Sequence, residues 1–188
     1  MDWIVGLPES HQRSTGEKMN SILTIVCQSI KIARFIPTQT NISMGNFARL
    51  FFEHIECIFG MPLLIVSDQD SRITSKFWAE ICSLEIIKWW LSTAFYLQTD
   101  GQSKALNRIV ESYLCAYCVD KPTAWVNLLP LAQFAYNNSM NATTNTMPNN
   151  LLFGMDYNIW FHVNGTPREK IPEAHVRIKK LHELHQRL

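Results

Sequence analysis

Three short strand-like runs lie within the first 36 residues, before any helical pattern begins. The runs at 1–5, 21–27 and 31–36 are rich in β-branched and aromatic residues, and the second and third are close enough to form a hairpin. Apolar residues at a spacing of 3.6 then predict a helix over 43–59, and an unbroken apolar run predicts a buried strand at 63–66. This order of strands and helices is typical of a mixed α/β layer.

The rest of the chain is mainly helical. Its expected elements are a helix capped by Thr74 or Ser75, a strand over 86–91, a helix over 101–119, a helical region after Pro122 and a loop over 137–149. The sequence therefore predicts a compact core over 1–155, followed over 156–188 by a linker and a basic helical tail.

Charge is distributed unevenly along the chain. The formal net charge of the 188 residues is +1, which gives no general attraction to nucleic acid, to membranes or to acidic partners. From Pro167 onward the chain has six Lys and Arg residues and three Glu residues. The tail therefore carries a net charge of +3 and the remainder −2. A chain of this length has one sizeable core, and a second full domain is not expected.

The five cysteines lie within apolar stretches, and no signal peptide precedes them. This pattern favours reduced thiols in an intracellular protein. The Cys115–Cys118 pair has CxxC spacing within a helical pattern, which favours two core thiols; a redox or metal role is the alternative. No apolar run reaches the roughly 18 residues that a membrane span needs, so no membrane association is expected.

Five blocks occur in a fixed order along the chain: MDWIVGLP, IARFIPT, LLIVSDQDSRITSKFW, LSTAFYLQTDGQSKALNR and LLPLAQFAYNNS. They resemble the integrase catalytic core of gypsy-class LTR retrotransposons, and less closely that of retroviruses, from residue 1 to about 155. The resemblance implies an RNase H-like α/β fold with a five-stranded mixed sheet and helices on both faces. It also implies metal-dependent 3′-end processing and DNA strand transfer.

The resemblance places the catalytic centre on three positions of this chain. The family's two aspartates match Asp2 and Asp68, and its glutamate, which follows after 35 intervening residues, falls on Lys104. Two metal ions about 3.5–4 Å apart stabilise the attacking and leaving oxygens of phosphoryl transfer, and carboxylates hold those ions. A protonated lysine cannot coordinate a metal, and it changes the charge of the site by two units. Lys104 therefore predicts an inactive centre.

Other carboxylates lie near these positions. Glu111 is seven residues beyond Lys104, or about 10 Å along a helix, which is too far to replace the glutamate without remodelling. Asp100 is nearer, but similar family members carry an aspartate there as well as the glutamate. Asp70 stands where the family commonly has glycine, and rescue of the centre by Asp70 is the open alternative.

The leading hypothesis is a truncated, degenerate integrase core that keeps the fold without catalysis. The alternatives are an active divalent-metal-dependent polynucleotidyl transferase and a non-catalytic module that binds nucleic acid or a protein. By resemblance, Mg²⁺ or Mn²⁺ is the cofactor, with binding expected to be weak or lost. The expected partners are DNA, possibly RNA, and a second copy of the chain, and the expected localisation is intracellular, nuclear if the protein acts as an integrase.

Overall fold

The protein is described by a computed structural model over residues 1–12, 15–67, 76–91 and 97–155, and the tail from 156 onward lies outside this range. Its strands form three small sheets. The strands are β1 (Asp2–Ile4), β2 (Ser10–His11), β3 (Lys18–Met19), β4 (Ser21–Val26), β5 (Ala33–Thr38), β6 (Leu64–Ser67) and β7 (Lys88–Leu91). The order β1-β4-β5 is antiparallel, β6 and β7 are parallel, and β2 pairs with β3.

The expected single five-stranded sheet is wrong for the described residues, which form a three-stranded sheet and two separate two-stranded sheets instead. A hydrogen bond connects the three-stranded sheet to the sheet of β6 and β7: the amino group of Met1 donates to the Val66 carbonyl over 2.7 Å. Residue 68, which follows β6, is not described.

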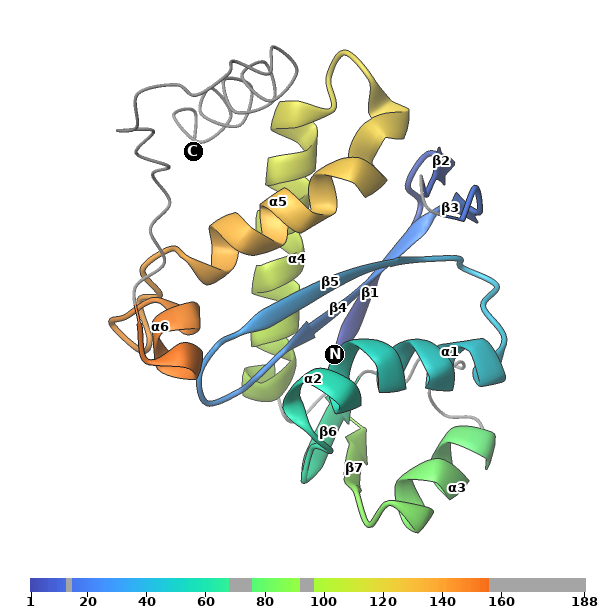
Figure 1. Ribbon diagram of the computed structural model, residues 1–188, viewed down its shortest axis with the longest axis vertical. Coiled ribbons are helices and arrows are strands. Elements are labelled where there is room, and N and C mark those ends of the chain that lie inside the picture. Colours follow the sequence, from blue (N-terminus) through green and yellow to red (C-terminus); the bar gives the residue numbers. More distant parts are fainter. Residues whose placement is uncertain (13–14, 68–75, 92–96, 156–188) are drawn as a thin grey trace, which may run out of the picture.

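Helices cover both faces of the three-stranded sheet, as the sequence predicts (Figure 1). They are α1 (Met44–Phe51), a π-helical stretch (Phe52–Glu56), α2 (Cys57–Phe59), α3 (Lys76–Leu84), α4 (Leu97–Tyr117), a 3₁₀ turn (Pro122–Ala124), α5 (Trp125–Asn137) and α6 (Pro148–Phe153). No helix within the described ranges is long and apolar enough to cross a membrane.

Alternation along the strands divides the core into two apolar clusters, because successive side chains of a strand point to opposite faces. Ile4, Ile22 and Phe35 pack against the buried stripes of α4 and α5. On the other face, Trp3, Leu23 and Ile36 pack against α1 and α3. Asp2 and Thr24 point to the same face as Ile4 and Ile22, so both polar side chains are directed toward α4.

The outer edge of β5 is covered by amide side chains of α5. Asn137 accepts from the Ala33 N–H over 2.8 Å and donates to the Ala33 carbonyl over 2.9 Å, as a neighbouring strand would. Two residues on, the Phe35 N–H donates to Gln133 Oε1 over 2.9 Å. The next outward-facing residue is Pro37, which has no N–H. These contacts use the hydrogen-bonding groups that an exposed edge strand would offer to another chain.

We expect Asn137→Ala to lower the free energy of unfolding by about 2–3 kcal/mol, because it leaves two buried backbone groups of Ala33 without partners. Urea denaturation followed by circular dichroism measures the change. Asn127→Ala, an exposed asparagine of the same helix, is the matched control. Equal effects of the two substitutions would contradict the role given to Asn137.

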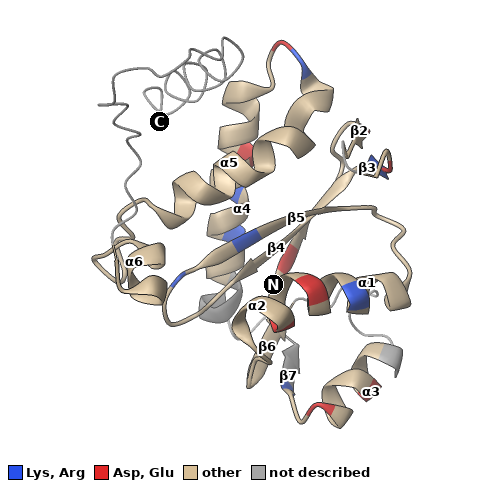
Figure 2. Ribbon diagram, in the orientation of Figure 1, with Lys and Arg blue, Asp and Glu red and all other residues tan. Residues whose placement is uncertain are grey.

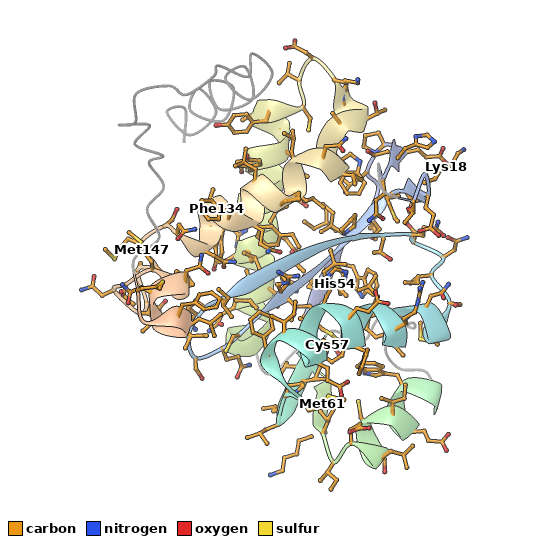
Figure 3. The ribbon with its side chains drawn as sticks, in the orientation of Figure 1. Lys18, His54, Cys57, Met61, Phe134 and Met147 are labelled. Atoms are coloured by element: carbon orange, nitrogen blue, oxygen red, sulfur yellow. The ribbon has the colours of Figure 1, made fainter. Side chains whose placement is uncertain are left out.

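A second cross-element contact joins β5 to the helix that follows it. His54 projects from the π-helical stretch toward the sheet (Figure 3), and its Nδ1 lies 3.3 Å from Arg34 Nη2. Arg34 has only N–H groups, so it donates and the imidazole accepts in its neutral form. Burial lowers the pKa of His54, the positive charge of Arg34 lowers it further, and Glu53 opposes the shift.

This contact predicts a loss of stability in mild acid. The folded-state pKa of His54 lies below the unfolded value of about 6.5, so the unfolded chain binds the proton more readily. The free energy of unfolding should fall as pH drops from 6.5 toward that lower pKa. His54→Gln should flatten this part of the profile in urea denaturation between pH 7 and 5, whereas His11→Gln, at an exposed position, should leave it unchanged.

Candidate functional site

Asp2 is a buried carboxylate at the start of β1, with 8% of its surface exposed. One carboxylate oxygen accepts from the Trp3 backbone N–H over 2.8 Å. The other accepts from the side-chain amide of Asn107 on α4 over 2.9 Å. Both oxygens of the first candidate ligand are therefore already hydrogen-bonded within the fold.

Thr24 on β4 fixes the orientation of that amide. Its hydroxyl lies 2.6 Å from Asn107 Oδ1 and 3.1 Å from the carbonyl oxygen of Asp2, and Thr24 is 1% exposed. Because the hydroxyl donates to the oxygen of the Asn107 amide, the nitrogen must face Asp2. Asp2, Asn107 and Thr24 thus form one buried polar network that joins β1, β4 and α4.

Sequence reasoning did not identify Asn107 or Thr24. The signal for Asn107 is its place on the inner stripe of α4, where Leu106, Val110 and Leu114 are buried at helical spacing. A polar residue on an apolar stripe needs a buried partner, because an unpaired amide would lose its hydrogen bonds with water. Thr24 carries a weaker signal, since threonine is common in strands.

The network makes Asn107 important for stability. We expect Asn107→Ala to lower the free energy of unfolding by about 2–3 kcal/mol, because the Asp2 carboxylate loses a buried hydrogen-bond donor. Arg108→Ala, at the adjacent exposed position, is the matched control and should change it by less than about 0.5 kcal/mol. Urea denaturation at pH 7 measures both, and a small effect at Asn107 would contradict the network.

Lys104 lies on α4 one turn before Asn107, but its helix begins earlier than the sequence predicts. The expected start at Gly101 placed Lys104 in the first turn, whereas the helix begins at Leu97 and Lys104 is about two turns inside it. Lys104 is exposed, and it is Asn107 that contacts Asp2. Residues three apart on a helix have Cβ atoms about 5–6 Å apart, so Lys104 lies beside the network.

The second candidate ligand, Asp68, lies outside the described residues, as does Asp70. The strand that leads to them is described as far as Ser67, which is buried at the end of β6. The hydrogen bond from Met1 to Val66 brings the end of β6 beside the start of β1.

The described donors do not make a site for a divalent cation. Hard cations such as Mg²⁺ prefer several oxygen ligands, and no group of three or more His, Cys, Asp or Glu side chains suited to a metal occurs within the described ranges. Around Asp2 the structure offers one carboxylate already held by two donors and the amide of Asn107. Figure 2 shows an acidic segment at β1 and basic segments on α4 and β5.

The CxxC pair is divided between the core and the surface. Cys118 is buried and burial raises the pKa of its thiol, whereas Cys115 is exposed. The expectation of two core thiols is therefore correct only for Cys118. The described cysteines are all free thiols.

In comparisons with known proteins, no family model matches the chain. The Tf2-3 and Tf2-4 transposon polyproteins of Schizosaccharomyces pombe are each 31% identical to it over 148 residues. The match covers 79% of this chain and 11% of each polyprotein. The chain thus spans about a tenth of the length of the curated relatives it matches.

Solved structures give the fold. The integrase catalytic core domain of HTLV-2 in complex with magnesium, in its trimeric form, superposes with a TM-score of 0.56 at 16% identity, covering 78% of this chain and 92% of that one. An intasome of simian T-cell lymphotropic virus in complex with the PP2A regulatory subunit B56 gamma gives a TM-score of 0.62 at 14% identity, covering 90% and 58%.

Proposed function

Because this chain belongs to the integrase family as an integrase-like core, related in sequence to a segment of Tf2 transposon polyproteins and in fold to retroviral cores, we propose that it is a non-catalytic, weakly DNA-binding remnant of an integrase. The proposal has two parts. The chain has the integrase-like fold with a polar network around Asp2, and the third acidic ligand is replaced by Lys104. Catalysis is lost because Lys104 replaces that ligand. The surface that binds nucleic acid remains, with a lower affinity.

The position of Lys104 on α4 carries the proposal. The same helix holds Asn107 against Asp2, so it packs beside the first ligand, and Lys104 is one turn away from that contact. Lys104 brings positive charge to the side of the centre where the family, by resemblance, has a carboxylate.

The same reasoning limits the choice of cofactor and partner. The HTLV-2 core was solved with magnesium, which makes Mg²⁺ or Mn²⁺ the ion to test on this chain. We assign no catalytic step to a metal, because the second candidate ligand, Asp68, lies outside the described residues. DNA is the proposed partner, with RNA as a weaker candidate. The proposed site of action of an integrase-derived protein is the nucleus.

Self-association is the remaining part of the proposal. The HTLV-2 core was solved in a trimeric and in a dimeric form, and we propose a homodimer for this chain. Sedimentation velocity of the purified protein measures it. A monomer at tens of micromolar concentration would contradict the dimer and leave the proposal for the catalytic centre unaffected.

Strand transfer and DNA binding test the function directly. The wild-type protein is incubated with a short duplex and either Mn²⁺ or Mg²⁺, and products are separated on a denaturing gel. We expect no strand-transfer product. Metal-dependent product that disappears in Asp70→Asn would instead establish an active transferase with Asp70 as a ligand.

Fluorescence anisotropy with a labelled duplex measures binding. Nonspecific affinity comes mainly from phosphate neutralisation, and the tail offers six cations against three anions, so we expect weak binding with a shallow salt dependence. Binding tighter than about 1 μM at 0.15 M salt would favour a dedicated nucleic-acid module. No detectable binding at 0.05 M salt would overturn the DNA-binding part of the proposal.

A further inference from the structure

A cavity of about 420 Å³ lies between α4, α5 and the loop that follows α5. We call it the α4–α5 pocket. Its α4 wall includes Ile109 and Val110, its α5 wall includes Ala132 and Ala135, and Phe35 of β5 lines it as well. Because alanine side chains are short, the α5 wall leaves the space beside α4 unfilled. Cavities of this volume with mainly apolar walls are typical of sites for small molecules.

The loop at the rim of the pocket is held by its own hydrogen bonds. The Asn141 N–H donates to the Thr146 carbonyl over 3.1 Å, and the Asn145 N–H donates to the Asn141 carbonyl over 2.8 Å. The hydroxyl of Ser139, which also lines the pocket, donates to the Ala135 carbonyl over 2.7 Å. The rim therefore has a defined shape before a ligand binds, which lowers the entropic cost of binding.

Two hydrogen bonds in this loop orient the phenol of Tyr136, which lines the pocket. The Thr143 N–H donates to Asn141 Oδ1 over 3.0 Å, so the nitrogen of this amide is the group available to Tyr136. Burial raises the pKa of Tyr136, and its hydrogen bond with Asn141 lowers it. A bond that favours the phenolate is one in which Asn141 donates and the Tyr136 oxygen accepts. The O–H of Tyr136 is then left to donate to another group, and it has no acceptor among the described residues.

The walls of the pocket select an uncharged ligand. None of the described residues that line it is Lys, Arg, His, Asp or Glu. A charged ligand would lose its hydration here without gaining a charged partner. A phenol is a stronger hydrogen-bond donor than acceptor, because its oxygen lone pairs are delocalised into the ring. The ligand atom that meets Tyr136 is therefore an acceptor.

We propose that the α4–α5 pocket binds a small, uncharged aromatic molecule that carries one hydrogen-bond acceptor. The acceptor receives the O–H of Tyr136, and the ring system lies between α4 and α5. The rings of Phe35 and Tyr136, with centroids 6.0 Å apart, offer such a ligand edge-on and offset contacts. This binding site is additional to the proposed function and does not depend on it.

Titration of the 188-residue protein with quinoline and with indole, followed by amide NMR spectra, tests the proposal. Both are uncharged bicyclic aromatics at neutral pH; quinoline offers a ring nitrogen as acceptor, whereas indole offers only an N–H donor. We expect quinoline to shift the amide signals of Tyr136 and Asn141 with a dissociation constant of about 1 mM or lower. Indole should bind at least threefold more weakly, because it leaves the Tyr136 O–H unpaired. No saturable shift with about 5 mM quinoline would overturn the proposal, as would equal binding of the two molecules.

Matched variants locate the site and identify the donor. Tyr136→Phe keeps the ring and removes the O–H, so it should weaken quinoline at least threefold and change indole less than twofold. Tyr117→Phe, outside the pocket lining, should change neither. Ala135→Trp fills the pocket and should abolish binding of both molecules, whereas Ala116→Trp, at an exposed position of α4, should preserve it. Equal losses of quinoline and indole in Tyr136→Phe, or equal effects of the two tryptophan variants, would refute the site.

Discussion

Lys104→Glu is expected to raise the melting temperature of the protein by about 5–10 °C in 10 mM Mg²⁺ or Mn²⁺, while the wild type changes by less than about 1 °C. A carboxylate at residue 104 would lie beside the network of Asp2 and Asn107 and supply the acidic ligand that the family has there. A ligand present at about 100 times its dissociation constant stabilises the folded state by about 2.7 kcal/mol. For a domain of this size that corresponds to several degrees.

Lys104→Ala separates the effect of removing the positive charge from the effect of adding a carboxylate ligand. It removes the positive charge without adding a ligand, so its melting temperature should respond to the metal much less than that of Lys104→Glu. Differential scanning fluorimetry of the three proteins, with Ca²⁺ and EDTA as further conditions, measures the comparison. If wild type and Lys104→Glu show the same metal dependence, Lys104 does not lie at the site, and its equivalence to the family's glutamate is wrong.

Trp78→Ala is expected to lower the free energy of unfolding by about 3–5 kcal/mol, which is a large share of the stability of a domain. Trp78 is 1% exposed and places α3 in the apolar cluster that also contains α1 and one face of the three-stranded sheet. Its ring lies edge-on to two aromatic neighbours, with centroids 4.7 Å from Phe47 and 5.3 Å from Phe51. Removing it leaves a cavity that the surrounding helices and sheet cannot fill completely.

The control for this prediction is Leu84→Ala on the same helix, where the side chain is 75% exposed and a change below about 0.5 kcal/mol is expected. Urea denaturation gives both values. A loss below 1 kcal/mol at Trp78 would show that α3 contributes little to the core. Partial unfolding confined to 76–91, detected by hydrogen exchange, would show instead that this segment unfolds separately from the three-stranded sheet.

Local patterns in the sequence predicted individual elements well. The hairpin of β4 and β5 and the long helical segment from Met44 to Phe59 follow from strand-like runs and from 3.6-residue apolar spacing. Their buried residues are those that the spacing places on one face, such as Phe47, Phe51 and Ile55. Patterns of this kind involve only residues that are close together in the sequence. In these elements the tertiary contacts favour the same structure as the local pattern.

Features that depend on distant contacts were missed. The sequence did not predict the start of α4 at Leu97, because a glycine such as Gly101 is typical of a turn. In the structure Gly101 lies inside the helix. Whether β1 and β6 belong to the same sheet depends on the number of backbone hydrogen bonds between these two distant strands. The β2–β3 pair falls in a segment without apolar alternation, and its Ser10 is buried through a hydrogen bond to the carbonyl of Thr123.

The candidate site was predicted in part. Asp2 was identified from the resemblance, and the structure places it in a buried network. The positions of Asp68 and Asp70 stay predictions. Asn107 and Thr24 were missed because their roles arise only when α4 packs on the sheet, between residues 83 positions apart in the chain. Such pairings have no signature in a single local stretch.

The amide cover over β5 has a consequence for the protein during its synthesis. The hairpin of β4 and β5 is local and can form as soon as it leaves the ribosome, but Asn137 follows Ala33 by 104 residues. At about 5–20 residues per second, the hairpin edge would wait on the order of 5–20 s for α5 to emerge. During that interval the nascent chain presents an open strand edge to other nascent chains on the same messenger RNA. Slow translation between residues 38 and 137 should therefore increase aggregation of the newly made protein, and chaperones that hold exposed strands should reduce it.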